Sequence, residues 1–222
     1  MTHTHFGVTH WNRTEILPVL ICPSADVDPY VHRANYEIDP AIGTYGYSMG
    51  AQRSNSWNNA CTSYPGNIFQ TGPSNHGNDG RGMYIYGVFS RATWSARFRD
   101  VTDGESQVIA VGEMLPHKGD HLKNGWMHHN SIWCMTTGPI NYPVYGLGEP
   151  GFNQVNAQFP GCSNWRNWST SQGFKSQHKG GAQFVLVDGS VQFLSENIDY
   201  ITYNRLGDRR DGGPLGEQWK NN

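Results

Sequence analysis

The stretch Gln183-Phe-Val-Leu-Val-Asp-Gly-Ser-Val-Gln-Phe-Leu-Ser195 decides the fold, because it holds two short β-rich runs around Asp188-Gly189. Asp-Gly between such runs is the strongest local signal of a hairpin, since a type I′ turn needs positive φ at both central residues. Both faces of the first run are apolar, which predicts a central strand, and the second run alternates, which predicts a half-exposed strand. Asn197–Leu206 then predicts a short closing helix, with Asn197 as N-cap and Gly207 as C-cap.

Upstream of this hairpin the chain is loop-rich. The sequence predicts strands at Met83–Ser90, Gln107–Glu113 and Asn124–Cys134. Tyr45–Met49 could also pair with another strand, although it lies within a stretch dense in Gly, Asn, Ser and Pro. Thr14–Ile21, interrupted by Pro18, predicts an edge strand or an extended segment. We therefore expect a mainly β fold (α+β with little helix), with a central antiparallel sheet, long disulfide-stapled loops and a short C-terminal helix. Residues 1–222 are expected to form a single globular domain, with 1–13 a mobile terminus.

Composition excludes several classes of protein. The chain has 222 residues, with Lys+Arg 16 against Asp+Glu 18 and a formal net charge of -2, so it is not a polybasic nucleic-acid binder. It contains no apolar run long enough to span a bilayer. A charged fraction of 15% beside an aromatic fraction of 13% argues against disorder, because disordered chains are rich in charge and poor in aromatic residues.

The four cysteines are Cys22, Cys61, Cys134 and Cys162, and none forms a Cys-x-x-Cys pair. An even number in a Lys-poor chain favours disulfides and an oxidising compartment. We favour the pairings Cys22–Cys61 and Cys134–Cys162, with four buried free thiols as the alternative. Met1-Thr-His-Thr-His-Phe lacks the basic and apolar regions of a signal peptide, so the export signal has been removed, export takes another route, or the protein is cytosolic.

Four groups of residues are weak candidates for chemistry. Gly46-Tyr-Ser-Met-Gly50 matches the G-x-S-x-G string with Ser48 as nucleophile, but its flanks do not resemble a strand and a helix. His178 and Asp188 stand at the two ends of one predicted strand, too far apart to touch at about 3.3 Å per residue, so structural roles are favoured over catalysis. A divalent metal could bind His117, Asp120 and His121, although a surface loop is the favoured interpretation. His3, His5 and His10 could also bind a transition metal.

Aromatic residues are the other candidate binding feature. Trp57, Trp126, Trp165 and Trp168 could stack on sugar rings or on a partner protein. The alternative is that they fill a core that is short of Leu and Ile.

Four blocks in order carry a resemblance to a known family. They are Leu20-Ile-Cys-Pro-Ser24, Val101-Thr-Asp-Gly-Glu-Ser-Gln-Val-Ile-Ala-Val-Gly-Glu113, His178 followed by nine residues and Asp188-Gly189, and Tyr203-Asn-Arg-Leu-Gly-Asp-Arg-Arg-Asp-Gly212. Over residues 14–216 the chain resembles the bacterial prepilin-type, processing-associated family of unknown function with the C-terminal His-x9-Asp-Gly motif. The family's N-terminal prepilin leader and long hydrophobic helix are not seen in this sequence.

The resemblance implies a pilin-head-like fold and an exported, extracytoplasmic protein of the type IV pilin or pseudopilin kind, as used in type II secretion. It carries over no catalytic residue. Pilin-like heads often hold calcium in acidic loops, which makes oxygen-ligand candidates of five residues: Asp79, Asp100, Asp103, Asp208 and Asp211.

The expected function is thus a non-enzymatic globular head that contacts pilin-like subunits or a cell-surface glycan. Two alternatives stay open. One is an extracellular metal-assisted hydrolase acting on an ester, lactone or glycoside, which would bring His, Asp or Ser side chains together in a cleft. The other is a carbohydrate-binding module, which would present aromatic rings to solvent.

Overall fold

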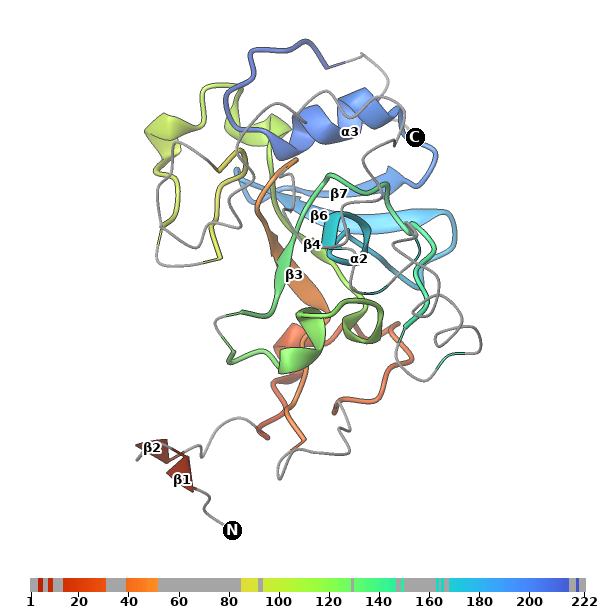
Figure 1. Cartoon of the computed structure of the whole chain (residues 1–222). Helices are drawn as coiled ribbons and strands as arrows, with labels where there is room; N and C mark the ends of the chain where they lie inside the picture. The colour runs from red at the N-terminus through yellow and green to blue at the C-terminus, as the bar shows by residue number, and fades with distance from the viewer. Residues whose placement is uncertain are drawn as a thin grey trace.

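The computed structural model of the protein describes residues 4–5, 8–9, 14–30, 39–51, 85–91, 94–128, 130–146, 149, 163, 165, 168–215 and 219. Within them one five-stranded mixed sheet has the order β5-β3-β4-β6-β7 (Figure 1). Its strands are β3 (Tyr45–Ser48), β4 (Ile109–Glu113), β5 (Trp133–Cys134), β6 (Gly181–Leu186) and β7 (Val191–Ser195). A separate two-stranded ladder, β1 (Thr4–His5) with β2 (Val8–Thr9), falls in the segment expected to be a mobile terminus.

The predicted hairpin is confirmed. β6 and β7 pair antiparallel from Gly181↔Ser195 to Val185↔Val191, and β4 pairs with the other side of β6, so β6 is central and β7 lies at the edge. The predicted type I′ turn is wrong, because that turn needs two central residues with positive φ and only Gly189, at φ 82°, has one here. The Gly189 amide bonds to the Leu186 carbonyl at 3.0 Å, which is the pattern of a type I turn closed by a left-handed glycine.

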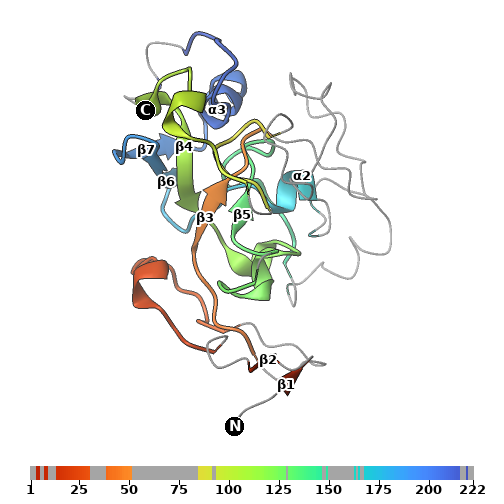
Figure 2. The same ribbon diagram turned by 90° about the vertical axis from the view of Figure 1, so that its left-hand side faces the viewer.

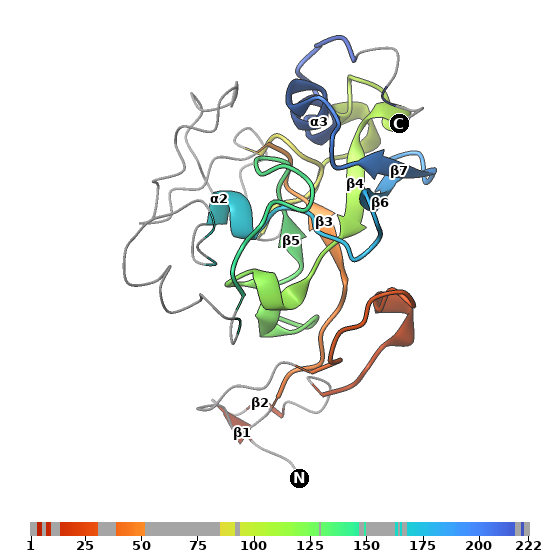
Figure 3. The same cartoon turned by 90° about the vertical axis from the view of Figure 1, so that its right-hand side faces the viewer.

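The closing helix is also confirmed, with different caps. α3 (Tyr200–Gly207) begins after Asp199, whose carboxylate accepts from the Thr202 amide at 2.8 Å, and Asp208 follows its last turn. Asn197 lies two residues too early to make this contact. A second helix, α2 (Trp168–Ser171), is a single turn. Figures 2 and 3 show α3 at one end of the molecule and the N-terminal segments at the opposite end.

Three strand predictions need correction. Of the described part of Met83–Ser90, only Phe89 pairs, as an isolated bridge to Ser95. Asn124–Cys134 contributes only β5, and β5 runs parallel to β3, so the sheet is mixed rather than purely antiparallel. Thr14–Ile21 contains a 3₁₀ turn, because Pro18 fits the first position of such a turn and cannot donate to a ladder. The described 3₁₀ turns are Pro18–Leu20, Phe98–Asp100, Glu105–Gln107, Pro116–Lys118 and Leu122–Asn124.

The main core lies between the sheet and α3. Phe184 of β6 meets Phe174 edge-to-face at 5.1 Å and Tyr203 of α3 at 6.3 Å, and all three are fully buried. Aromatic residues therefore supply much of the buried apolar area, as the low Leu and Ile content requires. The described part of the chain contains no helix with the length and hydropathy of a membrane span.

Candidate functional site

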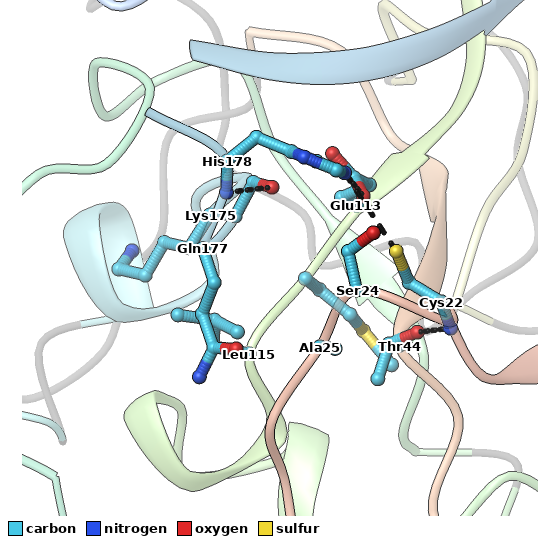
Figure 4. A pocket seen from close by; sticks show the side chains of 11 residues that line it. Cys22, Ser24, Ala25, Thr44, Glu113, Leu115, Lys175, Gln177 and His178 are labelled. Atoms are coloured by element: carbon cyan, nitrogen blue, oxygen red, sulfur yellow. Dashed lines mark hydrogen bonds and ion pairs between the residues drawn. The ribbon is translucent and has the colours of Figure 1, made fainter. Parts of the chain in front are cut away.

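Three side chains from distant parts of the chain meet at the end of β4, the middle strand of the sheet. The His178 Nε2 atom lies 3.2 Å from Glu113 Oε1 and 3.7 Å from Cys22 Sγ. Figure 4 shows the imidazole, the carboxyl group and the sulfur turned toward one another. Among the described residues this is the one group of three or more His, Cys, Asp or Glu side chains whose ligand atoms all lie within 4.8 Å of one another.

Hydrogen bonds to or from neighbouring backbone amides position each of the three residues. Glu113 ends β4 opposite Tyr45 of β3, and its other carboxylate oxygen accepts from the Gln183 amide of β6 at 2.8 Å. The Cys22 amide donates to Thr44 Oγ1 at 2.6 Å, which fixes the turn after Pro18–Leu20 against β3. The His178 amide donates to Ser176 Oγ at 3.1 Å, just before β6 begins.

A reciprocal contact between two loops closes the site. The Asp26 amide donates to Gln177 Oε1 at 2.5 Å, and Gln177 Nε2 donates back to the Asp26 carbonyl at 3.1 Å. The loop that carries Cys22 is thereby tied to the loop that carries His178. The positions of Cys22 and His178 are thus supported by a contact that does not involve the sulfur or the imidazole.

The surroundings of the site are largely buried. The Glu113 side chain is 4% exposed and that of His178 is 31% exposed, so the site opens to solvent on the histidine side. Burial, helped by a hydrogen bond to Cys22 and by the nearby Cys22 and Glu113, raises the pKa of Tyr45 to about 12. Tyr45 is therefore a neutral phenol beside the sulfur at any physiological pH.

Lys175 is a second buried titratable group next to the site. Its ammonium donates to the carbonyls of Thr170 at 2.7 Å and Gly173 at 3.3 Å, while its amide donates to the Glu113 carbonyl at 3.0 Å. Burial lowers the pKa of Lys175 to about 7, although the neighbouring Cys134 opposes the shift. The Lys175 ammonium is hydrogen-bonded to backbone carbonyls, so this residue helps to hold the loop beside the site in place.

The geometry favours metal binding over a proton relay. In a Cys–His–acid relay the acid binds one imidazole nitrogen and the thiol binds the other. Here Glu113 and Cys22 both approach the same nitrogen, Nε2, so the three donors point at a common centre. Such convergence is the arrangement of ligands around a cation.

The other candidate catalytic residues do not join this site. Ser48 is fully buried in β3, and its hydroxyl accepts from the Gly50 amide at 3.2 Å, so it offers no accessible nucleophile. Asp188 lies in the β6–β7 turn, where Oδ1 accepts from the Ser190 amide at 2.9 Å and from its hydroxyl at 2.7 Å. The separation of His178 and Asp188 at the two ends of β6 agrees with the prediction.

The His117, Asp120 and His121 set does not form a converging group. The His121 ring contacts Trp133 in a tilted arrangement and Trp168 edge-to-face, with centroids 5.3 and 4.3 Å away. Asp120 accepts from Trp168 Nε1 at 3.2 Å, and burial lowers the pKa of His117. Asp120 and His121 therefore anchor aromatic side chains.

The five candidate calcium ligands fall into three sets. Asp79 lies outside the described residues. Asp103, Asp208 and Asp211 lie near one another around the end of α3, but their carboxylates hold loop amides. Asp103 accepts from the Asp211 amide at 2.6 Å, and Asp100 accepts from the Arg97 amide at 2.9 Å. Calcium binding by this set stays a prediction.

The two disulfides also stay predictions. Cys22 and Cys134 are buried free thiols, and Cys61 and Cys162 lie outside the described residues. Burial raises the pKa of Cys134 to about 12, which makes it a core residue rather than a reactive one.

An aromatic pocket opens elsewhere, beside β3. It has a volume of ≈ 720 Å³ and is lined by Tyr47, Phe89, Trp94 and Trp126 together with Arg91. Tyr47 and Phe89 meet edge-to-face at 5.7 Å, and the Arg209 guanidinium lies 4.8 Å from the Trp94 ring centroid. The size and the mixed apolar and polar lining are those of a small-ligand pocket.

Of the tryptophans suggested as contact residues, Trp126 lines this pocket. Trp165 is buried and Trp168 packs on His121 and Trp133, so both serve the interior, while Trp57 lies outside the described residues. Sequence reasoning missed the roles of Tyr47, Phe89 and Trp94 in this pocket. Phe89 was missed because the segment Met83–Ser90 was expected to form a strand.

Sequence reasoning also missed the pairing of Cys22 and Glu113 with His178. A signal was present, since each of the three residues lies in a different block of the family resemblance. No curated protein and no solved structure matches the chain. The family model described as "Protein of unknown function (DUF1559)" matches residues 2–200. This match spans most of the 222 residues, and the chain therefore belongs to that family.

Proposed function

We propose that this protein is the globular head of an exported, pilin-like or pseudopilin-like protein, and that its role is to bind a surface ligand through the aromatic pocket. The observation that carries the proposal is the pocket itself, in which four aromatic side chains surround ≈ 720 Å³ beside the polar Arg91. Pyranose rings bind proteins through such combinations, because their C–H faces pack on aromatic rings while their hydroxyls need donors and acceptors. A cell-surface glycan is the proposed ligand.

The pocket is built to keep its shape without a ligand. Arg209 donates to the Ile85 carbonyl and, at 2.9 Å, to the Gly87 carbonyl, and its guanidinium packs on Trp94. Trp126 is fixed by its ring nitrogen, which donates to the Glu15 carbonyl at 2.8 Å. Preorganised rings lose little conformational entropy on binding, which supports a recognition role.

The exported, pilin-like part of the proposal is supported by the four blocks of resemblance and by the shape of the molecule. The N-terminal segments lie at the end opposite α3 (Figure 1), so an anchoring segment joined there would leave α3 and the sheet free. A small pilin-like head would then make contact with neighbouring subunits and with a surface glycan.

Glycan binding is tested on an array and then by calorimetry with the best hit. Trp126→Ala is expected to weaken binding by about 30-fold or more, the loss typical of truncating a central aromatic contact. Tyr145→Ala is the matched control, since Tyr145 is an exposed aromatic residue (43% exposed) outside the aromatic pocket. Absence of any hit, or equal loss in both variants, would refute the glycan role.

Export is tested separately with the natural gene product and its own N-terminus. Cell fractionation with an antibody to the head is expected to find the protein outside the cytoplasm. Recovery in the cytoplasm alone would refute the pilin-like assignment and leave the ligand-binding proposal standing.

A second candidate, the metal-assisted hydrolase, is favoured by one observation, the convergence of Cys22, Glu113 and His178. A screen with ester, lactone and glycoside substrates in the presence of added Zn²⁺ tests it. Turnover that is lost in His178→Gln and kept in His117→Gln would support the enzyme over the binding head.

A further inference from the structure

We propose that Cys22 Sγ, Glu113 Oε1 and His178 Nε2 are the three protein ligands of a mononuclear Zn²⁺ site, with a fourth position left for water or a small ligand. The three residues come from the loop after Pro18–Leu20, the end of β4 and the loop before β6 (Figure 4). This proposal is independent of glycan binding and of export.

The distances between the donor atoms fit a tetrahedral cation. With Zn–N and Zn–O near 2.0–2.1 Å and Zn–S near 2.3 Å, tetrahedral angles place N and O about 3.4 Å apart and S and N about 3.6 Å apart. The observed separations are 3.2 Å for His178 Nε2 to Glu113 Oε1 and 3.7 Å for His178 Nε2 to Cys22 Sγ. These two separations lie within a few tenths of an ångström of the tetrahedral values, and the third, between Glu113 and Cys22, is within 4.8 Å.

The donor chemistry selects the class of metal. A thiolate beside an imidazole favours Zn²⁺ and similar borderline cations, whereas calcium and magnesium prefer oxygen ligands alone. One thiolate and one carboxylate also balance a divalent charge. Because Glu113 is buried, a neutral assembly avoids the cost of leaving its negative charge without a full counter-charge.

The surroundings supply the other parts of a metal site. Glu113 is oriented by the Gln183 amide at 2.8 Å, and Tyr45 hydrogen-bonds Cys22, so ligands on both sides have outer partners. The three residues and Ser24 line a small pocket of ≈ 10 Å³, which has room for about one water molecule. A fourth ligand of that size completes the coordination.

The experiment uses the whole chain in a background with His3, His5 and His10 replaced by Asn, because those residues could bind metal on their own. The protein is stripped with a chelator under reducing conditions and titrated with Zn²⁺ against a chromophoric competitor. We expect one equivalent of tightly bound Zn²⁺. Co²⁺ replaces it as a spectroscopic probe and is expected to give a sulfur-to-cobalt charge-transfer band and tetrahedral visible bands.

Matched variants assign the ligands. Cys22→Ser is expected to abolish the charge-transfer band, and Glu113→Gln and His178→Gln to weaken binding by more than the 10–100-fold typical of losing an outer partner. Tyr45→Phe, which removes such an outer partner, is expected to fall within that 10–100-fold range. His117→Gln, at another half-buried histidine, is expected to bind like the parent.

A further background guards against variants that fail to fold. Replacing Cys61, Cys134 and Cys162 together leaves Cys22 as the one thiol of the chain. Retention of the cobalt band in this background supports the proposal without altering any ligand. Each protein is first checked for native circular dichroism.

Several outcomes would overturn the proposal. One is binding of less than half an equivalent of Zn²⁺ by the stripped parent. Others are a cobalt spectrum without a sulfur band, and wild-type affinity in both Cys22→Ser and His178→Gln. Detection of Cys22 in a disulfide with Cys61 in the exported protein would also overturn it, because a disulfide sulfur cannot serve as the thiolate ligand.

Discussion

Replacing the buried carboxyl group of Asp208 should make the protein more stable at neutral pH. Asp208 is 2% exposed and follows the last turn of α3. Burial, together with the nearby Asp211 and Asp103, raises its pKa from 3.8 to about 6, although a hydrogen bond from the Arg210 amide at 2.9 Å and the charge of Arg209 oppose the shift. The folded protein therefore holds this proton more tightly than the unfolded chain.

The sign and size of the effect follow from proton linkage. Between pH 3.8 and about 6 the unfolded chain has lost a proton that the folded protein keeps, so the free energy of unfolding falls as pH rises. Above the folded pKa the ionised Asp208 costs about 3 kcal/mol, from two pKa units at 1.36 kcal/mol each. Asn keeps an oxygen that can accept from the Arg210 amide and carries no charge. Asp208→Asn is thus expected to gain up to about 3 kcal/mol at pH 8 and little at pH 3.

Urea unfolding of both proteins from pH 3 to pH 8, followed by tryptophan fluorescence, measures this difference. For a chain of this size 3 kcal/mol corresponds to a rise in Tm of about 6–12 °C. Asp199→Asn is the control, because hydrogen bonds from the Thr202 amide and hydroxyl lower the pKa of Asp199, so no gain is expected there at pH 8. A stability difference for Asp208→Asn that is constant across pH, or absent at pH 8, would refute the assignment.

Three further predictions concern backbone conformation, thiol reactivity and helix capping. Gly50→Ala is expected to prevent stable folding, because the φ of Gly50 is +78° and a Cβ there would clash with the Gly87 amide nitrogen. Gly189→Ala, at φ +82° with open space around the added Cβ, should lower the free energy of unfolding by only about 1–2 kcal/mol in urea melts. Cys134 should resist iodoacetamide at pH 8 in the native protein and react after unfolding, as followed by mass spectrometry, since burial raises its pKa to about 12; labelling of native Cys134 at the rate of the unfolded chain would contradict this. Asp199→Ala should cost about 1 kcal/mol by removing the N-cap of α3, and an unchanged midpoint would argue against that role.

The predictable part of the fold lies where local chemistry decides the structure. The hairpin around Asp188-Gly189 and α3 follow from turn residues and short-range spacing. β4 was also predicted from its local sequence, in which β-branched residues lie close together. The predicted N-cap was wrong because the side-chain hydrogen bond of Asp199 moves the start of α3 by two residues. The predicted turn type was wrong because only Gly189 has a positive φ in that turn.

The unpredictable part depends on pairing between distant segments. Met83–Ser90 has the alternation of a strand, but among its described residues only Phe89 forms a β-bridge, to Ser95. The Phe89 side chain lines the aromatic pocket. The parallel pairing of β5 with β3 joins residues more than 80 positions apart, which no local pattern encodes.

The Cys22, Glu113 and His178 group was missed for a similar reason. The sequence separation between Cys22 and His178 is 156 residues, so spacing alone could not reveal the contact. Cys22 also has the appearance of a disulfide cysteine in a chain with four cysteines. Cys22 meets Glu113 and His178 because β4 ends and the loop before β6 lies at that point of the sheet. The residues next to Cys22 in the sequence do not determine this contact.

The strand order β5-β3-β4-β6-β7 has a consequence for how the protein acquires its structure during synthesis. β3 emerges from the ribosome early, yet its neighbour β4 begins some 60 residues later and the partner of β4, β6, later still. Such distant pairing slows folding and leaves apolar strands open to aggregation until the last third of the chain is made. The chain is thus expected to depend on chaperones that hold the nascent N-terminal half, and to fold in a single late step nucleated by the local β6–β7 hairpin.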